Sequence, residues 1–100
     1  MAKMQTDKVE IENVNHPGKP KRADAAMYQA MKQAFLNILP AKAPGLTVAE
    51  VQRGVLPHLP EHLFPGGAKA GWWSKAVQLD LEAKGVIARE KTSPLRLHRT

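Results

Sequence analysis

Apolar residues recur every three or four positions in three stretches of the chain, which predicts three amphipathic helices. The first spans residues 23–39, where Asp24 favours the positive N-terminal end and Pro40 ends the helix. The second spans residues 48–56, and the third spans residues 69–84.

The second helix begins at a clear start signal. Thr47 is followed three residues later by Glu50, the pattern of a capping box in which each side chain binds the other residue's backbone N–H. Leu46 and Val51 occupy the flanking positions at which a hydrophobic staple forms. Pro57 ends this helix, because proline cannot continue it.

Apolar side chains cover about half of the circumference of the third helix, so we expect it to pack against two neighbours. Trp73 lies in the middle of this arc and is predicted to belong to the core. Trp72 lies at its edge, and we assign it to the core with a partner surface as the alternative. Gly85 stands where helices commonly turn left-handed. The remaining stripe is polar and is predicted to be exposed; it consists of Gly71, Ser74, Lys75, Gln78 and Glu82.

Two β-type segments, residues 86–91 and 95–99, are joined by a turn that contains proline, which predicts a hairpin. Leu46 is placed to supply a short third strand. Three helices followed by a hairpin are the order of a winged helix-turn-helix, an α+β fold that is mostly α, and we expect it for residues 23–100. The connection over residues 57–67 is longer than the tight turn of a simple helix-turn-helix.

Residues 1–22 lack helical periodicity and end in a segment with two prolines and a glycine. We interpret them as a flexible basic N-terminal arm. The alternation around Val9 and Ile11 favours a short edge strand as the alternative.

Composition favours one cytoplasmic domain. The chain has 100 residues, of which 43% are apolar and 24% charged, and it contains no cysteine, as is usual in a reducing compartment. It holds no apolar stretch of the roughly 20 residues that cross a bilayer and no signal-peptide region, so no membrane partner is expected. The net charge of +6 is concentrated at the two ends, and a basic surface attracts polyanions.

The histidine-containing segment His58-Leu59-Pro60-Glu61-His62 matches the H-x-x-E-H pattern of some zinc peptidases. That pattern needs a continuous helix, which Pro60 opposes, so we expect exposed loop histidines and no metal site. The sequence contains neither a nucleophile elbow nor a phosphate-binding glycine loop. We therefore expect no enzymatic activity and no cofactor, and we see no sign of a small-molecule substrate.

Asp80 falls inside the apolar arc of the third helix. A carboxylate there needs a partner, because burying an unpaired charge is costly. Arg96 and Arg99 on the hairpin, or Lys84 one helical turn on, are the candidates. We interpret Asp80 as a structural tie between helix and hairpin.

The basic and polar surface is the candidate nucleic-acid interface, with DNA as the leading partner. The alternatives are an ordinary solvated charged face and a protein–protein or homodimerisation module on the same scaffold. The candidate contact residues are Ser74, Lys75 and Gln78 on the third helix, Arg89, Lys91, Arg96 and Arg99 on the hairpin, and Lys19, Lys21 and Arg22 on the arm.

The run from Gly71 to Ile87, GWWSKAVQLDLEAKGVI, together with Ser93-Pro94-Leu95-Arg96, resembles an uncharacterised family of short bacterial proteins. His16-Pro17-Gly18 and Ala25-Ala26-Met27-Tyr28 match the same family. The resemblance implies a bacterial origin and a winged-helix-like fold. It transfers no catalytic or binding residue.

Overall fold

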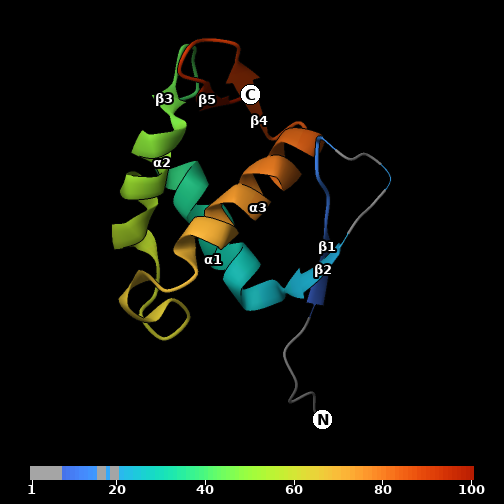
Figure 1. Ribbon diagram of the computed structural model, residues 1–100, viewed down its shortest axis with the longest axis vertical. Helices are drawn as coiled ribbons and strands as arrows, with labels where there is room; N and C mark the ends of the chain where they lie inside the picture. The colour runs from blue at the N-terminus through green and yellow to red at the C-terminus, as the bar shows by residue number, and fades with distance from the viewer. Residues whose placement is uncertain (1–7, 16–17, 19–20) are drawn as a thin grey trace.

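Three α-helices and two small antiparallel sheets make up the part of the chain that the structure, a computed structural model, describes: residues 8–15, 18 and 21–100 (Figure 1). The helices are α1 (Ala25–Ile38), α2 (Val48–Val55) and α3 (Ala70–Ala83), with 3-10 turns at Leu56–His58 and Pro65–Gly67. The strands are β1 (Lys8–Ile11), β2 (Lys21–Asp24), β3 (Leu46–Thr47), β4 (Ile87–Glu90) and β5 (Arg96–Arg99). The α+β class predicted from the sequence is confirmed.

The helix ends follow the local signals in the sequence. Asp24 caps α1 by accepting a hydrogen bond from the backbone N of Met27 at 3.0 Å. Thr47 and Glu50 form the predicted capping box of α2. Gly85, at φ 73°, follows α3 and supports the paired backbone bonds of a Schellman motif. The predicted start of the first helix was two residues early, because residues 23 and 24 belong to β2.

The predicted C-terminal hairpin and its third strand are both present as one sheet in the order β3-β5-β4. Leu97, which is fully buried, lies opposite both Leu46 and Arg89. Gly45 precedes β3 with φ 85°, and a Cβ there would lie 2.0 Å from the carbonyl oxygen of Leu97. Only glycine permits this close approach of the two backbones.

The core lies where α3 crosses α1, with α2 on one side and the β1–β2 hairpin on the other (Figure 1). Its largest fully buried apolar side chains come from all three helices, the α2–α3 connection and the sheet; they are Met31, Phe35, Val51, Val55, Phe64, Val77, Leu81, Ile87 and Leu97. No helix among the described residues has both the length and the hydropathy to span a bilayer.

The N-terminal segment departs from the prediction of a flexible arm. The strand expected around Val9 and Ile11 exists, and it pairs with β2 in an antiparallel hairpin. Ile11 retains 6% exposure and packs in the core, so this hairpin is part of the fold. Burial of one face of β1 explains the result, since an apolar strand gains free energy by covering the helices. Residues 1–7, 16, 17, 19 and 20 of the predicted arm lie outside the described residues.

Candidate nucleic-acid interface

Within the predicted polar stripe of α3, Ser74 and Gln78 face the protein, whereas Gly71 and Lys75 are exposed. Ser74 and Gln78 each retain only 3% of their surface, so the prediction that they contact a nucleic-acid groove is wrong. The Ser74 hydroxyl donates to the carbonyl oxygen of Gly71 at 3.0 Å, which satisfies it inside the helix and permits burial.

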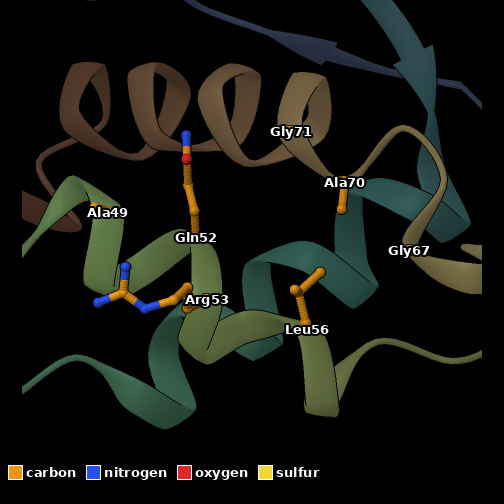
Figure 2. A pocket seen from close by; sticks show the side chains of 7 residues that line it. All are labelled: Ala49, Gln52, Arg53, Leu56, Gly67, Ala70 and Gly71. Carbon is orange, nitrogen blue, oxygen red and sulfur yellow. The ribbon is translucent and has the colours of Figure 1, made fainter.

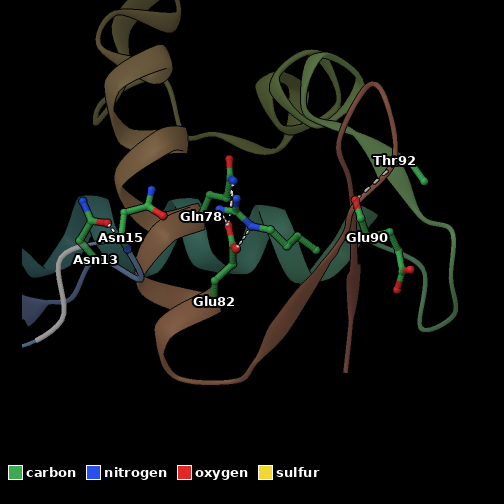
Figure 3. Close-up of polar contacts among 7 residues, drawn as sticks. Asn13, Asn15, Gln78, Glu82, Glu90 and Thr92 are labelled. Atoms are coloured by element: carbon green, nitrogen blue, oxygen red, sulfur yellow. Dashed lines mark hydrogen bonds and ion pairs between the residues drawn. The ribbon is translucent and has the colours of Figure 1, made fainter.

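Glu82 completes this buried side of α3, and we call Ser74, Gln78 and Glu82 the inner stripe. The amide of Gln78 donates to Glu82 Oε2 at 2.8 Å, as Figure 3 shows. Arg89 of β4 also donates to Glu82, from Nε to Oε1 and from Nη2 to Oε2 at 3.0 Å. The hydrogen bond to Glu82 raises the pKa of the Arg89 guanidinium above its usual value. Arg89 is therefore half-buried and paired within the protein, which opposes its predicted role in gripping phosphate.

Two further arginines of the hairpin are held by backbone carbonyls. Arg96 Nη1 donates to the oxygen of Gly45 at 3.0 Å and lies 3.9 Å from Glu50 Oε1. Arg99 Nε donates to the oxygen of Leu39, the C-cap of α1, at 2.9 Å. Both side chains fasten the sheet to neighbouring chain segments, a role that the sequence analysis did not assign to them.

The other predicted contact residues lie apart from the inner stripe. Lys91, just beyond β4, and Arg22, in β2, are exposed at separate places in the fold. Lys21 begins β2, and its side chain is outside the described part of the chain, as is Lys19 altogether. Lys75 is exposed on α3.

Asp80 is fully buried and joins three segments of the chain. The Tyr28 hydroxyl of α1 donates to Asp80 Oδ2 at 2.5 Å, and the backbone N of Glu12 donates to Oδ1 at 2.8 Å. Lys84 Nζ lies 2.9 Å from Oδ1. Burial, and then the bond to Asp80, raise the pKa of the Tyr28 phenol far above its usual value.

The predicted structural role of Asp80 and its pairing with Lys84 are confirmed, but the predicted tie between helix and hairpin is wrong. The tie leads to α1 and to the segment after β1, however, and not to the C-terminal hairpin. The proposed partners Arg96 and Arg99 are wrong, because both are bound to backbone carbonyls.

Another face of α3 carries an exposed aromatic ring. Trp72 is 57% exposed, the largest exposure among the bulky apolar residues that the structure describes. Trp73, at 5% exposure, holds it in a perpendicular contact with ring centroids 5.1 Å apart. Core placement, predicted for both rings, is confirmed for Trp73 and wrong for Trp72, which takes the alternative surface position.

Two exposed lysines flank Trp72 at a spacing of three residues. Lys75 lies on the same helix face as Trp72, and Lys69 is the N-cap of α3. We call Lys69, Trp72 and Lys75 the outer patch. The neighbours at Gly71 and Ala76 are small, so they leave the indole accessible.

A shallow groove runs between α2 and the first turn of α3, beside the outer patch. Figure 2 shows Gln52 directed from α2 toward α3 across this groove and Leu56 at its other end. Leu56 is 46% exposed. The lining residues are Ala49, Gln52, Arg53, Leu56, Gly67, Ala70 and Gly71. The groove therefore combines small and apolar side chains with one arginine and contains no carboxylate.

Residues 8–97 match a protein family described as "Family of unknown function (DUF6958)". The chain belongs to this family. No curated protein and no solved structure matches the chain. The predicted membership in an uncharacterised family is thus confirmed.

The part of the chain that matches the family runs from β1 into β5. It includes the inner stripe, the outer patch and the Asp80 network. The H-x-x-E-H segment within it does not form a continuous helix. His58 ends a 3-10 turn, and the Glu61 carboxylate accepts the backbone N–H of Gly66 at 2.9 Å. Within the described residues, no three His, Asp or Glu side chains are grouped closely enough to hold a metal ion.

Sequence reasoning missed the outer patch, although a signal for it exists. From His62 to Leu79 the chain contains no Asp or Glu, while Lys69, Trp72 and Lys75 recur at intervals of three. The helical pattern places Trp72 at one edge of the apolar arc of α3. Only the packing of α3 against the rest of the protein shows that this edge stays exposed.

Proposed function

We propose that this chain is a winged-helix domain that binds nucleic acid and has no catalytic activity of its own. The contact surface is the outer patch of α3. The single observation that carries the proposal is Trp72, 57% exposed, between two exposed lysines in an 18-residue stretch without a carboxylate.

The physical basis is the combination of positive charge and an aromatic face. Lysine side chains attract phosphate, and bound phosphates release counterions as the complex forms. Covering the exposed indole removes apolar surface from water, and the flat face of a nucleic-acid base can cover it by stacking. The net charge of +6 draws a polyanion toward the whole molecule, and Lys91 beyond β4 stands where a wing contacts the flanking backbone.

The test is the salt dependence of oligonucleotide binding, followed by fluorescence anisotropy. We expect measurable affinity at about 50 mM salt that falls steeply by about 200 mM. Replacing Lys69 and Lys75 together by Ala should reduce the slope of log K against log salt by about 2, one for each lost phosphate contact.

The matched control replaces Lys8 and Lys42 by Ala, which removes the same charge from two exposed sites outside the outer patch, one on β1 and one between α1 and β3. The control should keep the salt slope near that of the original chain. Absence of binding at low salt, or an equal loss of slope in the control, contradicts the proposal.

A homodimerisation module is the second candidate, because Trp72 and Leu56 leave apolar area exposed beside the groove. Sedimentation equilibrium separates the two functions. A dimer that dissociates on Trp72→Ala and shows no oligonucleotide affinity favours this candidate, whereas a monomer with affinity favours nucleic-acid binding.

A further inference from the structure

We propose that the outer patch takes nucleic acid with unpaired bases, by stacking a base on Trp72 while the flanking lysines hold the adjoining phosphates. The inference rests on the proposed function and narrows its partner from nucleic acid in general to single-stranded segments. DNA and RNA share the required chemistry, and the test below includes both.

The side chains suited to reading a duplex are not available. Glutamine and serine recognise base edges in the major groove when they project from a helix. Here Gln78 is committed to Glu82 and Ser74 to the Gly71 carbonyl, and both are 3% exposed. The exposed face of α3 presents no amide, hydroxyl or carboxylate in the outer patch. Lysine is therefore the only group in the outer patch that can contact a base edge.

The side chain suited to an unpaired base is available. Trp72 is more than half exposed, and its perpendicular contact with the buried Trp73 fixes the ring at one side. A base inside a duplex hides its face in the stack, whereas an unpaired base offers a face to an indole. The order imposed by Trp73 reduces the rotamer freedom that stacking must restrict.

The lysines complete the complementarity of charge. Lys69 and Lys75 are six residues apart, which is about 9 Å along the helix axis, with Trp72 midway. Arg53 of α2 lines the groove beside the outer patch and adds a third cation there. A strand whose base lies on Trp72 thus meets a cation in either direction along α3 and another across the groove.

The experiment compares three labelled ligands of matched sequence: single-stranded DNA, single-stranded RNA and a long blunt DNA duplex. The full chain is titrated with each at low salt. We expect both single strands to bind more tightly than the duplex, and the tryptophan fluorescence to be quenched on binding. Trp72→Ala should weaken single-strand binding about 5- to 150-fold, the range measured for removal of one stacking aromatic.

Trp72→Phe is the rescue variant, because phenylalanine keeps a stacking face, and it should retain most of the affinity while abolishing the quenching. Val14→Ala, which removes an exposed apolar side chain outside the groove, should leave the affinity unchanged. Circular dichroism checks that each variant is folded. These variants separate stacking at Trp72 from general loss of apolar surface.

Each outcome decides between the two proposals. Duplex binding that equals or exceeds single-strand binding, with loss in the Lys69/Lys75 variant, overturns this inference and leaves the proposed function standing. Single-strand binding that Trp72→Ala does not weaken also overturns the inference. Failure of all three ligands to bind at low salt overturns both. A preference for one of the two single strands identifies whether the outer patch takes RNA or DNA.

Discussion

Two faces of α3 reverse the usual amphipathic pattern, because the polar face is buried and the aromatic face is exposed. The inner stripe is polar and sealed, with Glu82 retaining 4% of its side-chain surface against Arg89. The outer patch centres on Trp72, an aromatic residue left 57% exposed. A buried polar residue needs a hydrogen-bond partner inside the protein, whereas an exposed aromatic residue indicates a partner outside it.

The reason for the inner stripe is hydrogen bonding. Each of its polar groups has a partner within the protein, and the described residues contain no buried side-chain nitrogen or oxygen without a hydrogen bond. The outer patch has no comparable internal partner. Its indole keeps more than half of its surface in solvent after folding, which is why we propose it for binding.

The largest expected effect comes from the two adjacent tryptophans. Trp73→Ala removes a buried ring from the core and should lower the free energy of unfolding by about 3–5 kcal/mol. Trp72→Ala should lower it by less than about 1 kcal/mol, because more than half of that ring is already in solvent. Urea unfolding followed by circular dichroism measures both. Equal losses would show that the outer patch is part of the core and would end the comparison.

Asp80→Ala gives the next effect and tests the buried polar network on the side of α3 that faces Tyr28. The change leaves the Tyr28 hydroxyl and the Glu12 backbone N–H without their acceptor, and it should cost about 3 kcal/mol. Asp80→Asn is the control, because it keeps one acceptor oxygen and should recover part of the loss. A cost below about 1 kcal/mol for Asp80→Ala would mean that water replaces the carboxylate.

Arg89→Met tests the inner stripe itself. Methionine keeps the apolar stem but leaves Glu82 nearly buried with only Gln78 as a partner, which should cost about 2 kcal/mol. The double variant Arg89→Met/Glu82→Gln removes the unpaired charge and should be more stable than Arg89→Met alone. If Arg89→Met instead weakens oligonucleotide binding without changing the urea midpoint, Arg89 contacts the ligand after all.

Signals that act between near neighbours in the chain were sufficient to predict most of the fold. The Thr47–Glu50 capping box and the left-handed turn at Gly85 depend only on residues within one helical turn. The short strand at Leu46 depends on its pairing with the apolar Leu97. The N-terminal hairpin was harder, because β2 has the polar sequence KRAD and offers no alternation to mark it as the partner of β1.

The candidate site could not be predicted in the same way. The burial of Glu82 depends on Arg89, which reaches α3 from a later strand and pairs with it, and Gln78 donates to the same carboxylate. A helical wheel ranks faces by hydrophobicity and contains no term for such a partner. The same omission explains the errors at Arg96 and Arg99, whose carbonyl partners belong to distant loops.

The smallest effect concerns the β4–β5 hairpin. Its Arg89 contacts the inner stripe, and the following residue, Glu90, pairs with His98. The His98 ring lies 2.7 Å from the Arg99 carbonyl oxygen through Nδ1 and 2.8 Å from Glu90 Oε2 through Nε2. Only the doubly protonated ring donates to both acceptors, so the Arg99 carbonyl, and then Glu90, raise the pKa of His98 above its usual value near 6.5.

The sign of the pH dependence follows from that shift. The folded state binds the His98 proton more tightly than the unfolded state, so this contribution to stability is complete below about pH 6.5 and decreases as the pH rises through the folded pKa. We expect the urea midpoint to fall slightly over that interval, and His98→Gln to remove the fall. An NMR titration of the His98 ring measures the pKa directly, and Glu90→Gln should lower it. A pKa at or below about 6.5 in the original chain would contradict the pairing of His98 with Glu90 across β4 and β5.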